Sequence, residues 1–132
     1  MGLDMMLGKH DNEGNYIELG YWRKANHIHN WFVVNCQDGI DECQETEISK
    51  QKLEDLLKVC NEIISAADRL LPDIVRSTLY EETLPTVSGF FFGGTEYDEY
   101  YLQDVRTTIK ILNNVLAETD FENEKVYYQS SW

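Results

Sequence analysis

A short segment near the amino terminus brings together side chains that acid–base chemistry and anion binding use. Arg23, Asn26 and His29 lie on a segment, residues 21–36, with helical periodicity. An imidazole titrates near neutral pH and can act as a general acid or base. A guanidinium can bind a carboxylate or a phosphate through paired hydrogen bonds, or form an ion pair with one of the chain's many carboxylates. For His29 we favour a core position with both ring nitrogens hydrogen-bonded; the alternative is a pocket shared with Asn26 and a carboxylate.

The carboxylates of such a pocket are expected from a distant, aromatic segment. Thr95 is predicted to cap a helix whose first turn carries Glu96 and Asp98, where negative charge suits the helix dipole. The terminal Ser-Ser-Trp would close the pocket, because a tryptophan at a chain end suggests docking into the fold. The residues predicted to bind a ligand or a partner are Arg23, Asn26, His29, Trp31, Glu96, Tyr97, Asp98, Ser130 and Trp132.

Metal and cofactor chemistry are not expected. His27 and His29 project from different faces of a regular helix, so both cannot bind one metal ion. The three cysteines include no Cys-x-x-Cys pair, and the acidic residues around Asp98 do not have the spacing of a calcium loop. The glycine-rich segment 89–94 lacks the Lys-Ser/Thr ending of a phosphate-binding loop, and Phe90–Phe92 within it are expected to wedge into the core. No catalytic residue is assigned, and a non-catalytic role is favoured over an enzyme.

Trp31 falls on the polar side of the predicted helix, opposite Phe32. An exposed tryptophan beside acidic surface is typical of an interaction patch. The alternative, equally weighted, is that another element covers it.

The charge of the chain limits its partners. Twenty-four acidic against eleven basic residues give a net charge of −13, which repels nucleic acids and anionic membranes and attracts basic protein surfaces. The acids gather in two stretches without a base, 38–47 and 80–104. Solubility alone would account for such acidity. No signal peptide or membrane-spanning run is recognised, so a cytoplasmic protein without direct nucleic-acid or membrane contacts is expected.

The strands and helices expected along the sequence must position these residues. Together they indicate one α+β domain over 1–132. Its three to four helices would pack on a small antiparallel sheet that includes the N- and C-terminal strands. The expected strands are short apolar segments at 3–7, 16–20 and 125–132. The expected helices span 21–36, the residues after the cap Ser49, 66–80 with an interruption at Pro72, and 95–118.

Four segments together carry a resemblance that covers the chain from end to end. They are MGLDM at 1–5, GYWRKANHIHNWF at 20–32, SGFFFGGTEYDEYY at 88–101 and YQSSW at 128–132. The combination resembles a family of small bacteriophage and prophage proteins, although Met6 stands where a tyrosine is expected. The resemblance implies a phage or prophage context and the cytosol of a bacterial host, without implying a reaction.

In that context we expect an acidic accessory protein that binds a basic host protein, in effect mimicking nucleic acid. One alternative is a small-ligand-binding or enzymatic domain with a pocket around His29, Arg23 and Asp98. A third is a self-associating structural protein; the sequence does not predict the oligomeric state. An enzyme requires a concave pocket with a perturbed histidine, whereas a mimic requires a flat or convex face of regularly spaced carboxylates.

Overall fold

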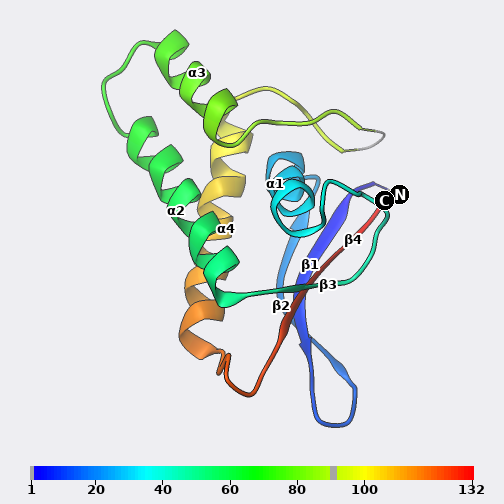
Figure 1. Cartoon of the computed structure of the whole chain (residues 1–132). Coiled ribbons are helices and arrows are strands. Elements are labelled where there is room, and N and C mark those ends of the chain that lie inside the picture. Colours follow the sequence, from blue (N-terminus) through cyan, green and yellow to red (C-terminus); the bar gives the residue numbers. More distant parts are fainter. Residues whose placement is uncertain (1, 90–91) are drawn as a thin grey trace.

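The computed structural model describes residues 2–89 and 92–132, and these form an antiparallel sheet covered by helices (Figure 1). The predicted α+β fold is confirmed, including the participation of both terminal strands in the sheet. The strands are β1 (Asp4–His10), β2 (Tyr16–Arg23), β3 (Thr46–Ile48) and β4 (Val126–Ser131). The helices are α1 (Asn26–Cys36), α2 (Lys50–Ala67), α3 (Asp73–Thr83) and α4 (Glu99–Glu118).

The first and last strands lie at the centre of the sheet, whose order is β2-β1-β4-β3 with every neighbour antiparallel. Met5 of β1 is paired on one side with Trp22 and on the other with Ser130. Alternate residues of β4 are buried, from Val126 through Tyr128 to Ser130. One face of the sheet therefore packs against the helices, as alternation in an antiparallel sheet predicts.

Aromatic contacts join the sheet to the helices. The ring of Phe32 on α1 stacks on Tyr128 of β4 with centroids 4.0 Å apart. Trp22 of β2 donates a hydrogen bond from Nε1 to the Thr108 hydroxyl of α4 over 2.8 Å. Each fully buried large side chain stabilises the fold by about 1.5–3 kcal/mol. These contacts fix the position of α1 and α4 relative to the end of β2.

Two predicted helix starts are wrong. Residues 21–23 complete β2 rather than beginning a helix, and α1 begins at Asn26 after Lys24 reverses the chain with φ +56°. Aromatic residues favour strands, and pairing with β1 extends β2 to Arg23. The cap of α4 is Asp98 rather than Thr95, so Glu96 lies before the helix and not in its first turn. The cap at Ser49 is confirmed, with its hydroxyl accepting from the Lys52 amide.

Trp31 is buried, with 9% of its surface exposed, so the interpretation as an exposed interaction residue is wrong. The cause is the position of α1, which contacts α2 and α4 while its other side lies on the sheet (Figure 1). Cover on two sides leaves little of α1 exposed, and Asn26, His27 and His29 are buried as well. Phe92 is also buried; Phe90 and Phe91 lie outside the described residues.

Candidate functional site

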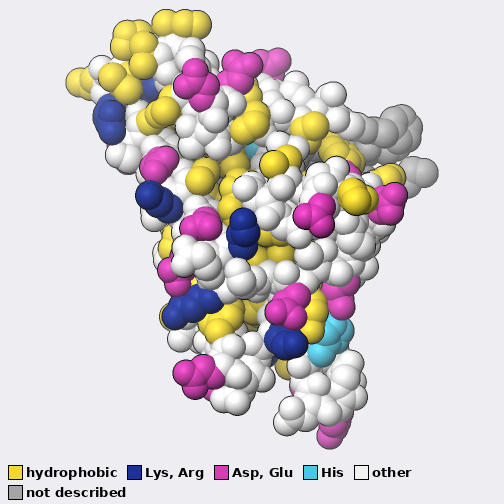
Figure 2. Space-filling view, viewed as in Figure 1, with side chains coloured by type: hydrophobic (Ala, Val, Ile, Leu, Met, Phe, Trp, Pro, Cys, Tyr) yellow, Lys and Arg dark blue, Asp and Glu magenta, His cyan; other side chains and the backbone are white. Residues whose placement is uncertain are grey.

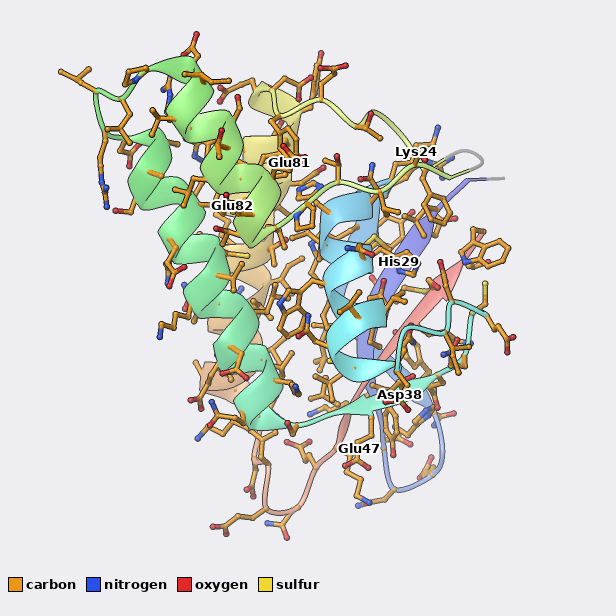
Figure 3. All side chains as sticks on the ribbon, turned by 45° about the horizontal axis from the view of Figure 1, so that its top comes forward. Lys24, His29, Asp38, Glu47, Glu81 and Glu82 are labelled. Atoms are coloured by element: carbon orange, nitrogen blue, oxygen red, sulfur yellow. The ribbon has the colours of Figure 1, made fainter. Side chains whose placement is uncertain are left out.

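His29, which is buried, lies in a chain of polar contacts that runs from the core to the surface (Figure 3 shows His29 on α1). Its Nδ1 is 2.6 Å from the Tyr128 hydroxyl, and its Nε2 is 2.9 Å from Oδ2 of Asp41. The second carboxylate oxygen of Asp41 accepts a hydrogen bond from the indole Nε1 of Trp132 over 3.0 Å. Both ring nitrogens of His29 therefore have partners, and the chain ties α1 to β4 and to the acidic segment 38–47.

This chain has the carboxylate–imidazole–hydroxyl order of a nucleophilic triad. The Tyr128 hydroxyl, however, belongs to a fully buried side chain, and burial raises its pKa well above the ordinary value. A substrate cannot reach this oxygen, and the hydroxyl stays protonated. The His29 chain therefore stabilises the fold rather than forming an active site.

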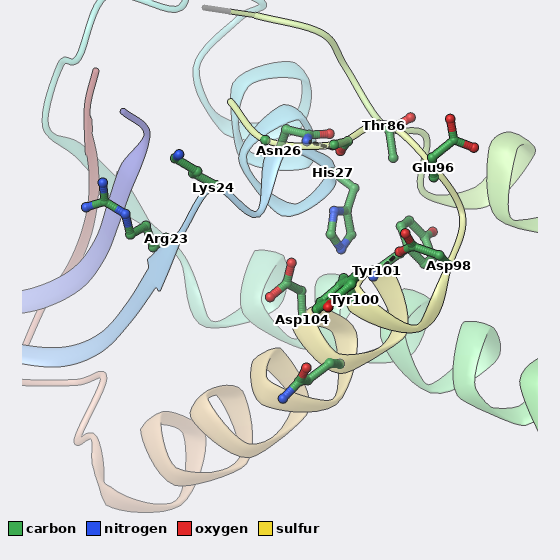
Figure 4. A pocket seen from close by; sticks show the side chains of 13 residues that line it. Arg23, Lys24, Asn26, His27, Thr86, Glu96, Asp98, Tyr100, Tyr101 and Asp104 are labelled. Atoms are coloured by element: carbon green, nitrogen blue, oxygen red, sulfur yellow. Dashed lines mark hydrogen bonds between the residues drawn. The ribbon is translucent and has the colours of Figure 1, made fainter. Parts of the chain in front are cut away.

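A polar pocket lies elsewhere, where the end of β2 and the start of α1 meet the start of α4 (Figure 4). Its volume is about 290 Å³. We call it the His27 pocket. It is lined by Arg23, Lys24, Asn26, His27, Thr86, Gly93, Gly94, Glu96, Asp98, Tyr100, Tyr101, Gln103 and Asp104.

His27 is the unusual group of the pocket. It is 2% exposed, and its Nε2 has no hydrogen-bond partner among the residues that the structure describes. Its imidazole stacks on the ring of Tyr101 with centroids 4.3 Å apart. Burial lowers the pKa of His27 to about 4, although the backbone of Tyr101 and the charge of Asp98 act in the opposite direction. The imidazole is therefore neutral at pH 7, and its Nε2 is a buried polar atom.

Asp104 is the second perturbed group of the pocket. Burial, reinforced by the charge of Asp98, raises its pKa to about 6. Figure 4 shows the imidazole of His27 directed into the space between Asp104 and Asp98. Asp98 is held in place as the cap of α4, where its Oδ1 accepts from the Tyr101 amide over 3.1 Å. A neutral imidazole and a carboxyl that titrates near neutrality thus share one pocket, the combination that acid–base chemistry uses.

Asn26 and two glycines shape the loop wall of the pocket. The Asn26 amide donates to the carbonyls of Phe92 and Gly94 over 3.1 and 2.8 Å, and its oxygen accepts from the Val87 amide over 2.9 Å. Gly93 has φ +90°, and a Cβ there would come within 3.0 Å of the Lys24 backbone oxygen. At Gly94 a Cβ would meet no atom within 4 Å. The loop is therefore pinned on one side and open to the pocket at Gly94.

Opposite charges lie at opposite ends of the pocket. Arg23 and Lys24 come from the end of β2, whereas Glu96 and Asp98 come from the segment before α4 (Figure 4). Arg23 also forms an ion pair with Asp4, whose Oδ1 is 3.2 Å from Nη1, and remains half-exposed. Basic and acidic residues thus border the pocket on opposite sides, and Figure 4 shows the charged groups of Arg23 and Lys24 directed away from His27.

The structure brings together four of the predicted site residues, Arg23, Asn26, Glu96 and Asp98, and separates the others from them. His29 and Trp132 belong to the chain of polar contacts through Asp41 that is described above. Ser130 is 1% exposed, and its hydroxyl has no hydrogen-bond partner in the described part of the chain. Tyr97 points elsewhere, and its hydroxyl accepts from the Thr86 amide over 3.2 Å. The terminal Ser-Ser-Trp does not line the pocket.

Sequence reasoning missed His27, Lys24 and Asp104. No local signal separates His27 from His29, because both lie in the first turns of the same helix. The difference arises from the element that covers each side of α1, which is α4 at His27 and β4 at His29. The helical pattern around Asp104 resembles an ordinary solvated face.

Within the described part of the chain, no three His, Cys, Asp or Glu side chains gather as metal ligands. None of the helices in that part combines the length and apolar character needed to cross a bilayer. Comparisons with models of known protein families, with curated proteins and with solved structures find no match for this chain.

Proposed function

We propose that this protein binds a small dipolar molecule in the His27 pocket. The observation that carries the proposal is His27, which lines the pocket and whose buried Nε2 has no hydrogen-bond partner among the described residues. A buried polar atom left without a hydrogen bond costs about 1–3 kcal/mol. A ligand that supplies this hydrogen bond recovers the cost, so the site favours the bound state.

The lining sets the chemistry of the ligand. Arg23 and Lys24 at the basic end suit an anionic group such as a carboxylate or a phosphate. Asp98 and Asp104 at the other end accept hydrogen bonds from amino or hydroxyl groups. Tyr100, which is 78% exposed, offers an aromatic surface at the mouth of the pocket. Amino acids and nucleoside monophosphates combine these features in molecules that suit a pocket of this size.

Binding is tested by recording amide ¹H–¹⁵N spectra during separate additions of amino acids, nucleoside monophosphates and inorganic phosphate. We expect a dipolar probe to shift the signals of His27, Gly94 and Tyr100, and phosphate alone to bind more weakly. Gly94→Leu adds a side chain at a residue that lines the pocket, where a Cβ meets open space, and should abolish these shifts. Thr95→Leu is the matched control, because Thr95 is exposed and does not line the pocket.

Two outcomes would refute the proposal. One is that the probes shift signals only outside the pocket. The other is that Gly94→Leu binds them as tightly as the unmodified protein does. A His27→Gln variant adds a finer test, because glutamine retains a donor and an acceptor but lacks the imidazole.

We also propose, as a second function, that the protein acts in a phage or prophage context as an acidic protein that binds a basic host protein in the bacterial cytosol. Its support is the acidic segment 38–47, in which Asp38, Glu42, Glu45 and Glu47 are exposed. Figure 3 places Asp38 and Glu47 beside the sheet, well away from Glu81 and Glu82 on α3. The acids thus form separate groups, and segment 38–47 is the one we assign to a partner.

Affinity capture from a bacterial lysate at low and high salt tests this second proposal. Replacing the four exposed acids of segment 38–47 by their amides should abolish capture of a basic protein. The matched control replaces Glu81 and Glu82 by glutamine and should retain it. The proposal would be contradicted if capture of the basic protein were the same at low and high salt. It would also be contradicted if capture persisted after the four acids of segment 38–47 were replaced.

A further inference from the structure

The outer face of α2 and α3 exposes aliphatic side chains. Leu70, in the linker between these helices, is fully exposed, and Ile74 is 74% exposed. Figure 2 shows hydrophobic side chains gathered at the end of the molecule formed by the α2–α3 linker. Beside them runs a groove of about 740 Å³ lined by Glu54, Leu57, Lys58, Asn61, Glu62, Ser65, Arg69 and Leu79.

The groove continues into a second hollow. Leu79 borders both, and the second hollow includes Ile74 and Val75 of α3. Contiguous apolar surface of this kind marks an interaction site on a soluble protein. We call the two hollows together with Leu70 the α2–α3 face. It shares no lining residue with the His27 pocket, so a partner bound at one leaves the other accessible.

Charge distinguishes the α2–α3 face from the rest of the molecule. Residues 50–83 contain five basic and seven acidic residues, whereas the remainder of the chain contains six basic and seventeen acidic residues. Two copies of a chain with a net charge of −13 repel each other over most of their surfaces. The lining of the groove is balanced in charge, with Glu54 and Glu62 against Lys58 and Arg69, so that repulsion is weak there.

The order of charges along α2 favours a second copy in an antiparallel orientation. A two-fold interface places the same surface on both copies. With the axis near residues 61 and 62, Glu54 lies about 11 Å from it at 1.5 Å per residue. Arg69, two residues after the end of α2, lies on the opposite side of the axis. Glu54 of one copy then lies opposite Arg69 of the other, and Lys58 lies within one turn of the second copy's Glu62. The opposite charges therefore meet twice, around the apolar groove.

We propose that the α2–α3 face is a self-association surface, on which a second copy of this chain docks with its α2 antiparallel to the first. Leu57 and Leu79 form the apolar centre, Leu70 and Ile74 extend it, and the Glu54–Arg69 pairs set the orientation. The proposal is independent of a ligand in the His27 pocket.

Sedimentation velocity over low micromolar to submillimolar concentrations, with the full chain, tests the proposal. We expect a reversible dimer whose dissociation constant rises about tenfold or more in Leu70→Asp, because an apolar anchor is lost. Ile40→Asp is the matched control, since Ile40 is half-exposed but lies outside the α2–α3 face. It should dimerise like the unmodified protein.

A charge exchange tests the orientation. Glu54→Arg and Arg69→Glu should each weaken the dimer about two- to thirtyfold, because two pairs are lost per dimer. The double variant should restore the original affinity. Leu70, Glu54 and Arg69 are exposed, so these variants should fold normally. A monomer at every concentration, a dimer indifferent to Leu70→Asp, or a double variant no tighter than the single variants would overturn the proposal.

Discussion

His27 and Asp104 influence stability in opposite directions as the pH changes. The pKa of Asp104 is raised to about 6, so between about pH 4 and 6 the folded protein keeps a proton that the unfolded chain has released. Its contribution to the free energy of unfolding therefore falls as the pH rises through this range. The pKa of His27 is lowered to about 4, so the unfolded chain is the form that keeps the proton up to about pH 6.5. Its contribution rises over nearly the same range, and the two largely cancel.

Removing one of the two titratable groups should reveal the pH dependence that the other gives to the free energy of unfolding. In Asp104→Asn only the His27 contribution remains, so the free energy of unfolding should climb more steeply between pH 4 and 6.5 than in the unmodified protein. At pH 4 the two proteins should be alike, because Asp104 is then largely protonated. Since Asp104 is only half-buried, solvent screens part of the penalty, and we expect the variant to be about 1 kcal/mol more stable at pH 7. Urea unfolding across this pH range measures the difference.

Asp68→Asn is the control for the loss of one negative charge from an acidic protein. Asp68 is exposed and lies at the end of α2, outside the pocket. The difference between its effects on the free energy of unfolding at pH 4 and at pH 7 should reflect only the loss of one negative charge. If Asp104→Asn behaved in the same way, the carboxyl in the pocket would not be perturbed.

At the scale of single elements, Asp98 links the start of α4 to the pocket. Its carboxylate accepts from the Tyr101 amide, as an N-cap does. The negative charge of Asp98 adds to the rise in the pKa of Asp104, and it partly opposes the lowering of the His27 pKa by burial. One side chain therefore fixes where the helix begins and sets the charge of the site beside it.

Asparagine and alanine at position 98 should separate these two roles. Asp98→Ala removes the cap and should cost about 1 kcal/mol of unfolding free energy, whereas Asp98→Asn keeps a capping oxygen and should cost much less. Thermal unfolding followed by circular dichroism provides the comparison, with Ser49→Ala at the cap of α2 as a reference. Equal losses in Asp98→Ala and Asp98→Asn would mean that charge rather than capping stabilises the start of α4.

The elements that the sequence predicts well are those whose signal is local. Ser49 precedes an isolated apolar stripe, and α2 follows it directly. Thr95 and Asp98 are both good caps followed by acidic residues, so local chemistry could not choose between them. In the structure Asn26 holds the loop at Gly94, and α4 begins at Glu99. Residues 21–23 fit a helical stripe as well as a strand, and pairing with distant β1 decides between them. The choice of His27 over His29 is likewise made by α4 and β4.

For the whole molecule, the net charge of −13 should make stability depend on salt. Folding brings the carboxylates closer together than they are in the unfolded chain, and their repulsion opposes it. Added sodium chloride screens exposed charges beyond a Debye length of about 10 Å at 0.1 M. The urea midpoint should therefore rise with ionic strength at pH 7.

At pH 4, where many carboxylates are protonated, the same salt series should have a smaller effect. A midpoint that fell with salt at pH 7 would show that ion pairs such as Lys9 with Glu124, whose atoms lie 2.5 Å apart, outweigh the general repulsion. The comparison also guides the lysate experiment, since salt must weaken a partner's binding without unfolding the protein.

The central position of β1 and β4 in the sheet has a consequence for how the protein is made. A ribosome synthesises β1 well before β4, so the edge of β1 that pairs with β4 stays open while all the elements between them are made. A two-stranded hairpin of β1 and β2 is only marginally stable alone. The α2 and α4 helices can form as they emerge, but the sheet closes only once β4 has left the exit tunnel. Until then Leu3, Met5 and Leu7 lack their final cover, and chaperones would act at this stage.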